Sequence, residues 1–134
     1  MDGVMDARKA RYFGVMGDFN DDLESETLAL VSGSNGIEPD EFGAGDRREL
    51  HPVGWWIPGE RRFSYSGRGG CRLLDHILVS HDLSLALSRA GVESQLLEAS
   101  VRCEDSGSPG GCPRSDHAPV WAEFEFGTTE KKQR

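Results

Sequence analysis

The chain has 134 residues, of which 37% are hydrophobic and 28% charged, as expected for a single globular domain. Its formal net charge of −8 at pH 7 argues against a surface that coats nucleic acid by neutralising phosphates, but is compatible with a local metal site that cuts phosphodiesters. No apolar run approaches the roughly 18 residues of a transmembrane segment, and residues 1–9 lack the apolar stretch of a signal peptide, so the default expectation is a cytoplasmic protein.

The N-terminal third is predicted to hold a strand followed by a short helix. Residues 12–17 form an apolar run that ends abruptly at Asp18, which is typical of a buried strand. Residues 24–32 predict a helix with Ser25 or Asp22 as its N-cap, and with Leu28 and Val31 facing the core. Residues 33–50 are rich in glycine and mixed charges, and predict a loop.

The remaining sequence predicts further strands separated by turns. Strands are expected at residues 62–66, 74–80 and 118–126, with a broader strand region at 92–103. Residues 67–70 predict a turn, residues 82–90 one or two helical turns, residues 104–115 a loop, and residues 128–134 a solvated tail. No internal repeat or linker divides the chain, so one domain over residues 1–134 is expected.

Polar residues directly follow the first predicted strand. Asp18 and Asn20 are two positions apart, so on an extended backbone their side chains lie on the same side and can bind one ligand. Asp and Asn are equally favoured in turns, and that interpretation stays open. A calcium-binding loop that starts at Asp18 is set aside, because Leu23 stands where glycine is required and Ala29 where a bidentate glutamate is required.

Two other predicted strands supply a carboxylate and a histidine. Asp75 is in phase with the apolar residues of its strand, where a charge needs a partner. His117, which ends the segment Ser115-Asp116-His117 just before the last strand, is a candidate partner, since an Asp–His contact fixes the imidazole tautomer and raises its basicity. His76 falls on the opposite face of the strand and is interpreted as structural.

Two carboxylates, an Asn and a His favour metal-assisted phosphoester hydrolysis, because that reaction needs a base for water, a hard cation and donors to the phosphoryl oxygens. A Ser-His-Asp hydrolase with Ser34 or Ser66 as the nucleophile is a weaker alternative, because neither serine lies in a Gly-x-Ser-x-Gly turn.

Three segments resemble motifs of the endonuclease/exonuclease/phosphatase superfamily, the exonuclease III and DNase I-like group. They are Val-Met-Gly-Asp-Phe-Asn-Asp-Asp at 15–22, Leu-Asp-His-Ile-Leu-Val-Ser at 74–80 and Arg-Ser-Asp-His-Ala-Pro-Val at 114–120. Each motif alone is a weak signal, but the three occur in the order that the family shows. Residues 63–66 also resemble the segment that usually precedes the second motif in the family. The resemblance covers about residues 10–126.

The resemblance implies a role for each of five residues. Asp18 corresponds to the residue that orients or deprotonates the attacking water, and Asn20 to the one that holds the scissile phosphate. Asp116 corresponds to a residue near the divalent metal, which would be Mg²⁺ or Mn²⁺. His117 corresponds to the donor to a phosphoryl oxygen, and Asp75 to the carboxylate that braces this histidine. The substrate class stays open among nucleic acid, phospholipid and nucleotide phosphoesters.

The resemblance also implies an α/β fold: half of a DNase I-like, four-layer α/β/β/α sandwich, with a mostly antiparallel sheet and short flanking helices. In the family, strands with a metal-facing Asn and the principal metal-binding Glu precede the first motif, whereas the 17 residues before Asp18 contain neither Asn nor Glu. We therefore expect the C-terminal half of the fold, with the missing N-terminal half as a partner. The alternative to a phosphoesterase is a catalytically inactive fragment or interaction module.

Overall fold

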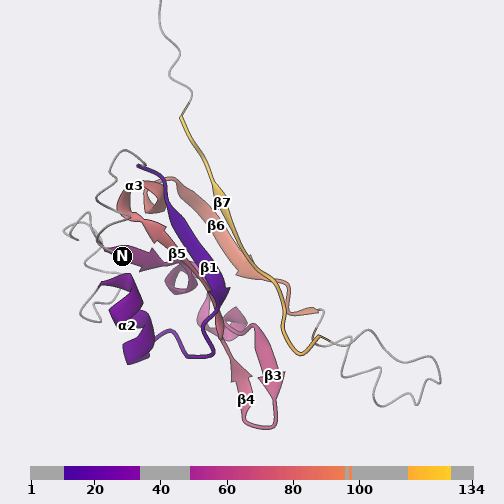
Figure 1. The fold of residues 1–134 in the computed structure, drawn as a ribbon. Coiled ribbons are helices and arrows are strands. Elements are labelled where there is room, and N and C mark those ends of the chain that lie inside the picture. The colour runs from indigo at the N-terminus through magenta and orange to yellow at the C-terminus, as the bar shows by residue number, and fades with distance from the viewer. Residues whose placement is uncertain (1–10, 34–48, 96, 98–114, 128–134) are drawn as a thin grey trace, which may run out of the picture.

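The computed structural model describes residues 11–33, 49–95, 97 and 115–127. Most of the loops predicted at 33–50 and 104–115, and the tail at 128–134, lie outside these residues. The described part is mostly antiparallel sheet with a few short helices (Figure 1). In this part, no helix has the length and apolar character needed to cross a membrane.

The strands form three antiparallel groups. A three-stranded sheet has the order β1-β5-β2, and is built from β1 (Gly14–Asp18), β5 (Asp75–Ser80) and β2 (Leu50–Pro52). The two other groups are the hairpin of β3 (Tyr65–Gly67) and β4 (Gly70–Arg72), and the pair of β6 (Leu87–Val92) and β7 (Val120–Phe124). The helical segments are α2 (Glu26–Ser32), α3 (His81–Ser84) and the 3₁₀ turns η2 (Val53–Trp56) and η3 (Gly59–Arg61).

Helix α2 forms where the sequence predicts it. The Ser25 hydroxyl accepts a hydrogen bond from the Leu28 amide at 3.2 Å, which caps the first turn, and Glu26 complements the helix dipole there. Gly33, with a φ of +73°, ends the helix in the left-handed conformation that glycine adopts at low cost. The predicted cap and the predicted core-facing residue Leu28 are both confirmed, since Leu28 is only 1% exposed.

The cap gives a direct test of this local assignment. Replacing Ser25 with Ala should lower the free energy of unfolding by about 1 kcal/mol, because the Leu28 amide loses its acceptor. Urea denaturation of the parent and the variant measures the difference. Ser88→Ala, at an exposed position of β6, is the control, and an equal effect of the two substitutions would contradict the capping assignment.

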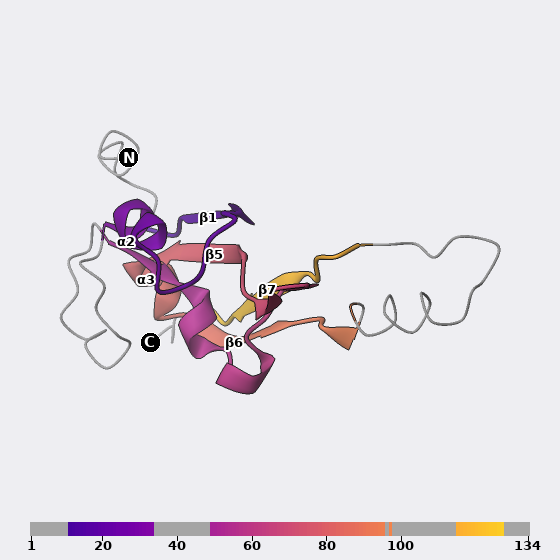
Figure 2. The same cartoon turned by 90° about the horizontal axis from the view of Figure 1, so that it is seen from below.

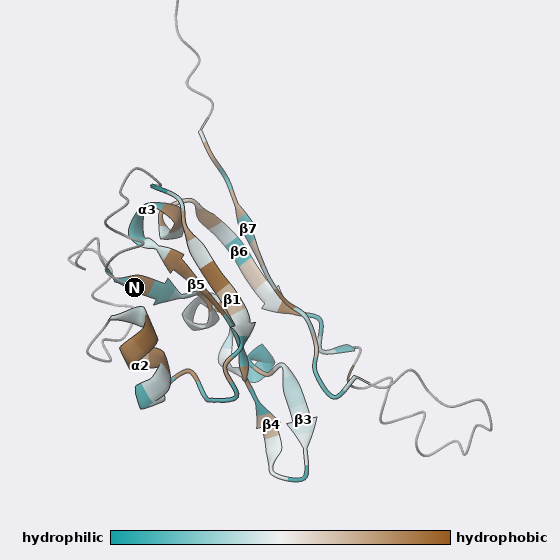
Figure 3. Cartoon of the chain, in the orientation of Figure 1, coloured by the Kyte–Doolittle hydropathy of each residue, from teal (hydrophilic) through white to brown (hydrophobic). Residues whose placement is uncertain are grey.

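Strand β5 is central because it pairs with β1 on one edge and β2 on the other. On one side of this sheet Leu78 packs with Leu28 and Leu50 to form the core, and Phe13, Val15, Phe19 and Val31 surround it. Figure 3 shows apolar residues along β1, β5 and α2. Helix α2 therefore covers one face of the sheet.

In the described part of the chain, the other face of β1 is exposed, which corrects the prediction of a buried strand. Directly opposite residues in an antiparallel ladder share a face, so Met16 with Ile77 and Asp18 with Asp75 lie on the side away from the core. Met16 is 73% exposed on this side. Figure 2 shows β1 at one side of the body, with β5 next to it and β6 and β7 beyond. The apolar run at 12–17 predicted a strand correctly, but burial also depends on a covering layer, and no described segment covers this side of β1 at Met16.

Two boundaries differ from the sequence predictions in the region after β5. The helical turn is shorter than residues 82–90. Strand β6 covers residues 87–92, and residues 95 and 97 are helical, whereas residues 96 and 98–103 of the predicted strand region lie outside the described residues. The reason is tertiary pairing, since Val92 lies opposite Val120 and Leu87 opposite Phe124 in the ladder with β7. Strand β2 was missed because three residues ending in proline carry no periodic signal.

Candidate functional site

An aspartate–histidine contact joins the start of β5 to the segment before β7. His117 Nδ1 lies 2.6 Å from Asp75 Oδ2, so the predicted contact between these residues is present. A single backbone bridge between Tyr65 and His117 sets the histidine against β3, and their ring centroids are 5.3 Å apart. The side chains of His117 and Asp75 are 30% and 25% exposed, so the contact is sheltered but still open to solvent.

Ser64 supports the contact between Asp75 and His117 through hydrogen bonds. Its hydroxyl donates to Asp75 Oδ2 at 2.7 Å, and accepts from the backbone amides of Leu74 and Asp75, each at 3.1 Å. Its carbonyl accepts from the Ala118 amide at 2.7 Å, directly after His117. The sequence placed Ser64 on a predicted strand ahead of Asp75 but gave it no role; its complete burial between polar partners becomes visible only in the fold.

Asp18 completes the group, because it lies directly opposite Asp75 in the ladder between β1 and β5. One ligand atom from each of Asp18, Asp75 and His117 lies within 4.8 Å of the others. Two like charges placed directly opposite in a sheet repel each other and destabilise it. Such an arrangement is favourable only if a cation or a protonated group compensates the charge, and His117 compensates in part.

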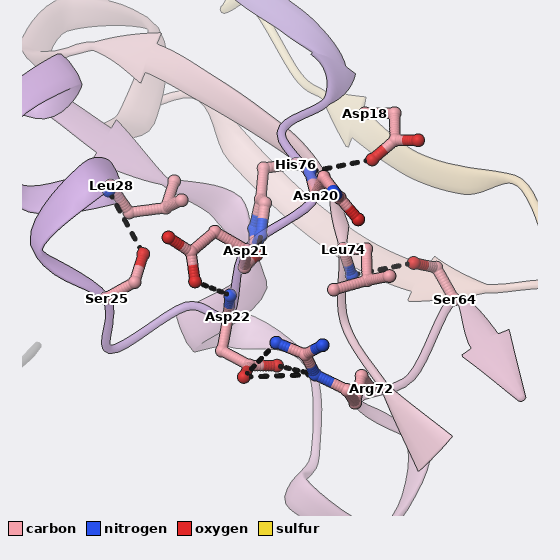
Figure 4. Close-up of polar contacts among 10 residues, drawn as sticks. All are labelled: Asp18, Asn20, Asp21, Asp22, Ser25, Leu28, Ser64, Arg72, Leu74 and His76. Carbon is pink, nitrogen blue, oxygen red and sulfur yellow. Dashed lines mark hydrogen bonds and ion pairs between the residues drawn. The ribbon is translucent and has the colours of Figure 1, made fainter. Parts of the chain in front are cut away.

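Asn20 does not continue the strand, which corrects the expectation of an extended Asp18-Phe19-Asn20 backbone. Its φ is +52°, a left-handed conformation that Asn tolerates better than most residues. The Asn20 amide donates to Asp18 Oδ1 at 2.8 Å, as in an Asx turn (Figure 4). The turn interpretation is therefore the one observed, and it orients the carboxylate of Asp18.

The remaining candidates occupy other positions around this group. Asp116 is exposed and is not one of the three residues that gather, although it is adjacent to His117. His76 is buried on the opposite face of β5, and its Nε2 lies 2.8 Å from the carbonyl oxygen of Asp21. Of the two nucleophiles weighed for a serine hydrolase, Ser34 lies outside the described residues, and the Ser66 hydroxyl accepts from the thiol of Cys71.

The surroundings of His117 raise its pKa above the usual value. The hydrogen bond to Asp75 is the main cause, and the negative charges of Asp75, Asp18 and Asp116 act in the same direction, while partial desolvation opposes them. The imidazole thus stays protonated to a higher pH than a free histidine. Because Nδ1 is occupied by Asp75, Nε2 is the ring nitrogen left to donate to a ligand.

The donor chemistry of the group fits a hard divalent cation. Carboxylate oxygens are the ligands that Mg²⁺ and Mn²⁺ prefer, and Asp18 and Asp75 place two of them on one side of the sheet. Asp18 carries the more accessible carboxylate, since one oxygen of Asp75 is shared by Ser64 and His117. These residues could therefore hold a metal ion through Asp18, with Asp75 and His117 beside it.

Comparison with known protein families places these residues in context. The family model described as Endonuclease/Exonuclease/phosphatase family matches residues 3–117, which include Asp18, Asp75 and His117. The chain belongs to the endonuclease/exonuclease/phosphatase family. Searches of curated proteins and of solved structures found no significant match. The matched range thus spans β1, β5 and the segment before β7, which supply the three residues that lie together.

Proposed function

We propose that this member of the endonuclease/exonuclease/phosphatase family is a divalent-metal-dependent phosphoesterase, and that Asp18, Asp75 and His117 form its reaction centre. The observation that carries the proposal is the gathering of these residues within 4.8 Å, with the cross-strand carboxylates and the Asp75–His117 contact. Family membership supports hydrolysis of a phosphoester bond. A bound Mg²⁺ or Mn²⁺ would neutralise phosphoryl charge and lower the pKa of a water molecule.

Each residue has a proposed step in the hydrolysis. Asp18 accepts a proton from the attacking water or orients it, because its carboxylate is exposed and is fixed by the Asn20 amide. Protonated His117 donates from Nε2 to a phosphoryl oxygen as negative charge builds up, and Asp75 holds the ring in place. We further propose that the Asn20 side chain contacts the scissile phosphate and that Asp116 lies near the metal.

The open face of β1 supports a further part of the proposal. Met16 is 73% exposed on the side of the sheet that carries Asp18 and Asp75. An apolar residue beside a reaction centre is stabilised when a second layer covers it. We propose that the described sheet is half of a four-layer sandwich, that residues 1–134 form one domain of this kind, and that an N-terminal half of the fold is its partner.

The substrate is proposed at the level of its chemistry. A phosphoester of a nucleic acid, phospholipid or nucleotide offers the non-bridging oxygens that a metal and His117 recognise, and the fold class does not choose among them. A net charge of −8 disfavours binding along an extended nucleic-acid backbone. A small diester such as bis(p-nitrophenyl) phosphate is therefore a suitable first substrate.

The test measures Mn²⁺ binding and diester hydrolysis by the purified 134-residue chain. We expect one Mn²⁺ per chain, displaced by EDTA, with binding weakened in Asp18→Asn. Hydrolysis by this chain should be feeble, since only two carboxylates gather at the site among the described residues. Absence of Mn²⁺ binding, or binding that Asp18→Asn leaves unchanged, would contradict the proposed function. Robust EDTA-sensitive turnover would instead contradict the proposal that the chain is half of the fold.

The exposed side of β1 also favours a second candidate, an interaction module without catalysis. In that case Met16 would contact a partner, and Asp18 and Asp75 would have no cation to bind. A measurement of Mn²⁺ binding distinguishes the two candidates, since only the phosphoesterase requires Mn²⁺ to bind at Asp18.

A further inference from the structure

A forked ion pair outside the reaction centre connects two segments that are 50 residues apart in the sequence. Arg72 Nη2 lies 2.7 Å from Asp22 Oδ2, and Arg72 Nε lies 3.1 Å from Oδ1 and 3.2 Å from Oδ2 (Figure 4). Such a contact fixes the relative orientation of the two groups as well as their separation. The side chains are 42% and 45% exposed, so the pair contributes little to global stability.

A second contact holds the neighbouring residue of the same turn. His76 Nε2 lies 2.8 Å from the carbonyl oxygen of Asp21, and because a carbonyl only accepts, Nε2 carries the hydrogen and donates it. His76 is buried, and its ring meets the ring of Phe19 edge-on at 5.8 Å. Asp75 and His76 are adjacent on β5 and face opposite sides of the sheet. Asp75 therefore contacts His117 in the reaction centre, whereas His76 contacts the turn.

A third contact between the two segments is a backbone hydrogen bond, in which the Phe19 amide donates to the carbonyl of Leu74 at 2.9 Å. Three alternate residues of one segment thus contact the turn. Arg72 contacts Asp22, Leu74 contacts Phe19, and His76 contacts Asp21. Asn20 lies between these anchors in its left-handed conformation, and its amide binds Asp18 Oδ1. A shift of the turn would therefore rotate the carboxylate of Asp18 as well.

We propose that Arg72 and His76 are positioning residues, which hold the Asp18–Asp22 turn in the conformation that directs the carboxylate of Asp18 toward Asp75 and His117. Neither side chain belongs to the group of three that could hold a metal ion. Their effect passes through the turn and the Asn20 amide. The inference rests on the proposed function for its metal readout, and a second readout is independent of that function.

The first test measures the dissociation constant of Mn²⁺ for the 134-residue chain and its Arg72→Gln variant. Electrostatics alone predicts tighter binding in the variant, because a positive charge near the site is removed. Loss of positioning predicts the opposite sign, a weakening of about twofold to fivefold, as expected for an exposed ion pair. Arg72→Lys keeps the charge but loses the fork, so its affinity should lie between those of the parent and Arg72→Gln.

Arg89 offers a matched control. It forms a forked, exposed pair with Glu123 across β6 and β7, at 2.9 Å and 2.8 Å. Arg89→Gln removes the same kind of contact away from the turn, and should leave the Mn²⁺ affinity unchanged. Binding by Arg72→Gln that equals or exceeds that of the parent would overturn the proposal.

The second test measures amide hydrogen exchange at Phe19 and Asn20 without metal. Both amides are bonded in the turn, so their exchange should quicken by about twofold to fivefold in Arg72→Gln and stay unchanged in Arg89→Gln. His76→Gln retains an N–H donor and should protect these amides better than His76→Leu. If the parent binds no Mn²⁺, the proposed function fails while these rates still decide the positioning role; unchanged rates in Arg72→Gln would refute it.

Discussion

Asp75→Asn is expected to lower the pKa of His117 and to weaken Mn²⁺ binding by about 10- to 100-fold, the usual effect of losing a residue that orients a neighbour in a metal site. The substitution preserves the shape of the side chain and its contact with Ser64, but removes the negative charge that favours protonated His117. The pKa can be followed by NMR titration of the His117 ring, and the affinity by calorimetry.

The same substitution has a pH-dependent effect on stability, whose sign follows from the raised pKa of His117. A raised pKa in the folded state stabilises the fold fully below the unfolded value of about 6.5, and this stabilisation disappears as the pH rises through the folded value. The difference in unfolding free energy between the parent and Asp75→Asn should therefore be largest in mild acid and shrink above the pKa of His117.

Asp82→Asn is the control for this experiment. Asp82 has nearly the same exposure as Asp75, 26% against 25%, and faces Arg11 rather than His117. It should change neither the titration of His117 nor the Mn²⁺ affinity. An unchanged His117 titration in Asp75→Asn, combined with a large drop in melting temperature, would show that Asp75 has only a structural role.

Asp18→Asn is expected to raise the melting temperature without metal while it weakens Mn²⁺ binding at least tenfold. The gain in stability has a specific origin, because Asp18 and Asp75 are directly opposite in the ladder and repel each other; relief of such a contact is worth roughly 0.2–1 kcal/mol. Asn can still accept the hydrogen bond from the Asn20 amide, so the turn should be kept. Opposite effects on stability and affinity are typical of residues retained for function.

Thermal unfolding with and without Mn²⁺ measures both effects together. Mn²⁺ should raise the melting temperature of the parent and not that of Asp18→Asn. Glu125→Gln, at an exposed position after β7, controls for the loss of one negative charge. If Asp18→Asn lowers the melting temperature without metal and binds Mn²⁺ like the parent, then Asp18 is a turn residue only.

The sequence predicted the elements whose cause is local. Ser25 and the apolar spacing of Leu28 and Val31 predicted helix α2, and the apolar run before Asp18 predicted strand β1. Asp75 and His117 were predicted to meet because a charge on an apolar strand face needs a partner, and their atoms lie 2.6 Å apart. In these cases a few neighbouring residues, or one strong electrostatic requirement, determine the outcome.

The features that escaped prediction depend on distant contacts. The exposure of Met16 is set by what covers the sheet, and the extent of β6 by its register against β7. The direct opposition of Asp18 and Asp75 follows from the pairing of two strands far apart in the chain, which periodicity cannot reveal. Arg72 likewise gave no signal, because its partner Asp22 is remote in the sequence.

Paramagnetic broadening of backbone amides by a trace of Mn²⁺ tests the central claim most directly. A cation held by Asp18, with Asp75 and His117 beside it, should broaden amides near residues 18, 75 and 117 first, although these residues come from three separate segments. EDTA should restore the signals, and Asp18→Asn should abolish the effect. Broadening centred instead on another acidic segment, such as residues 21–26, or uniform over the surface, would contradict a metal site at these three residues.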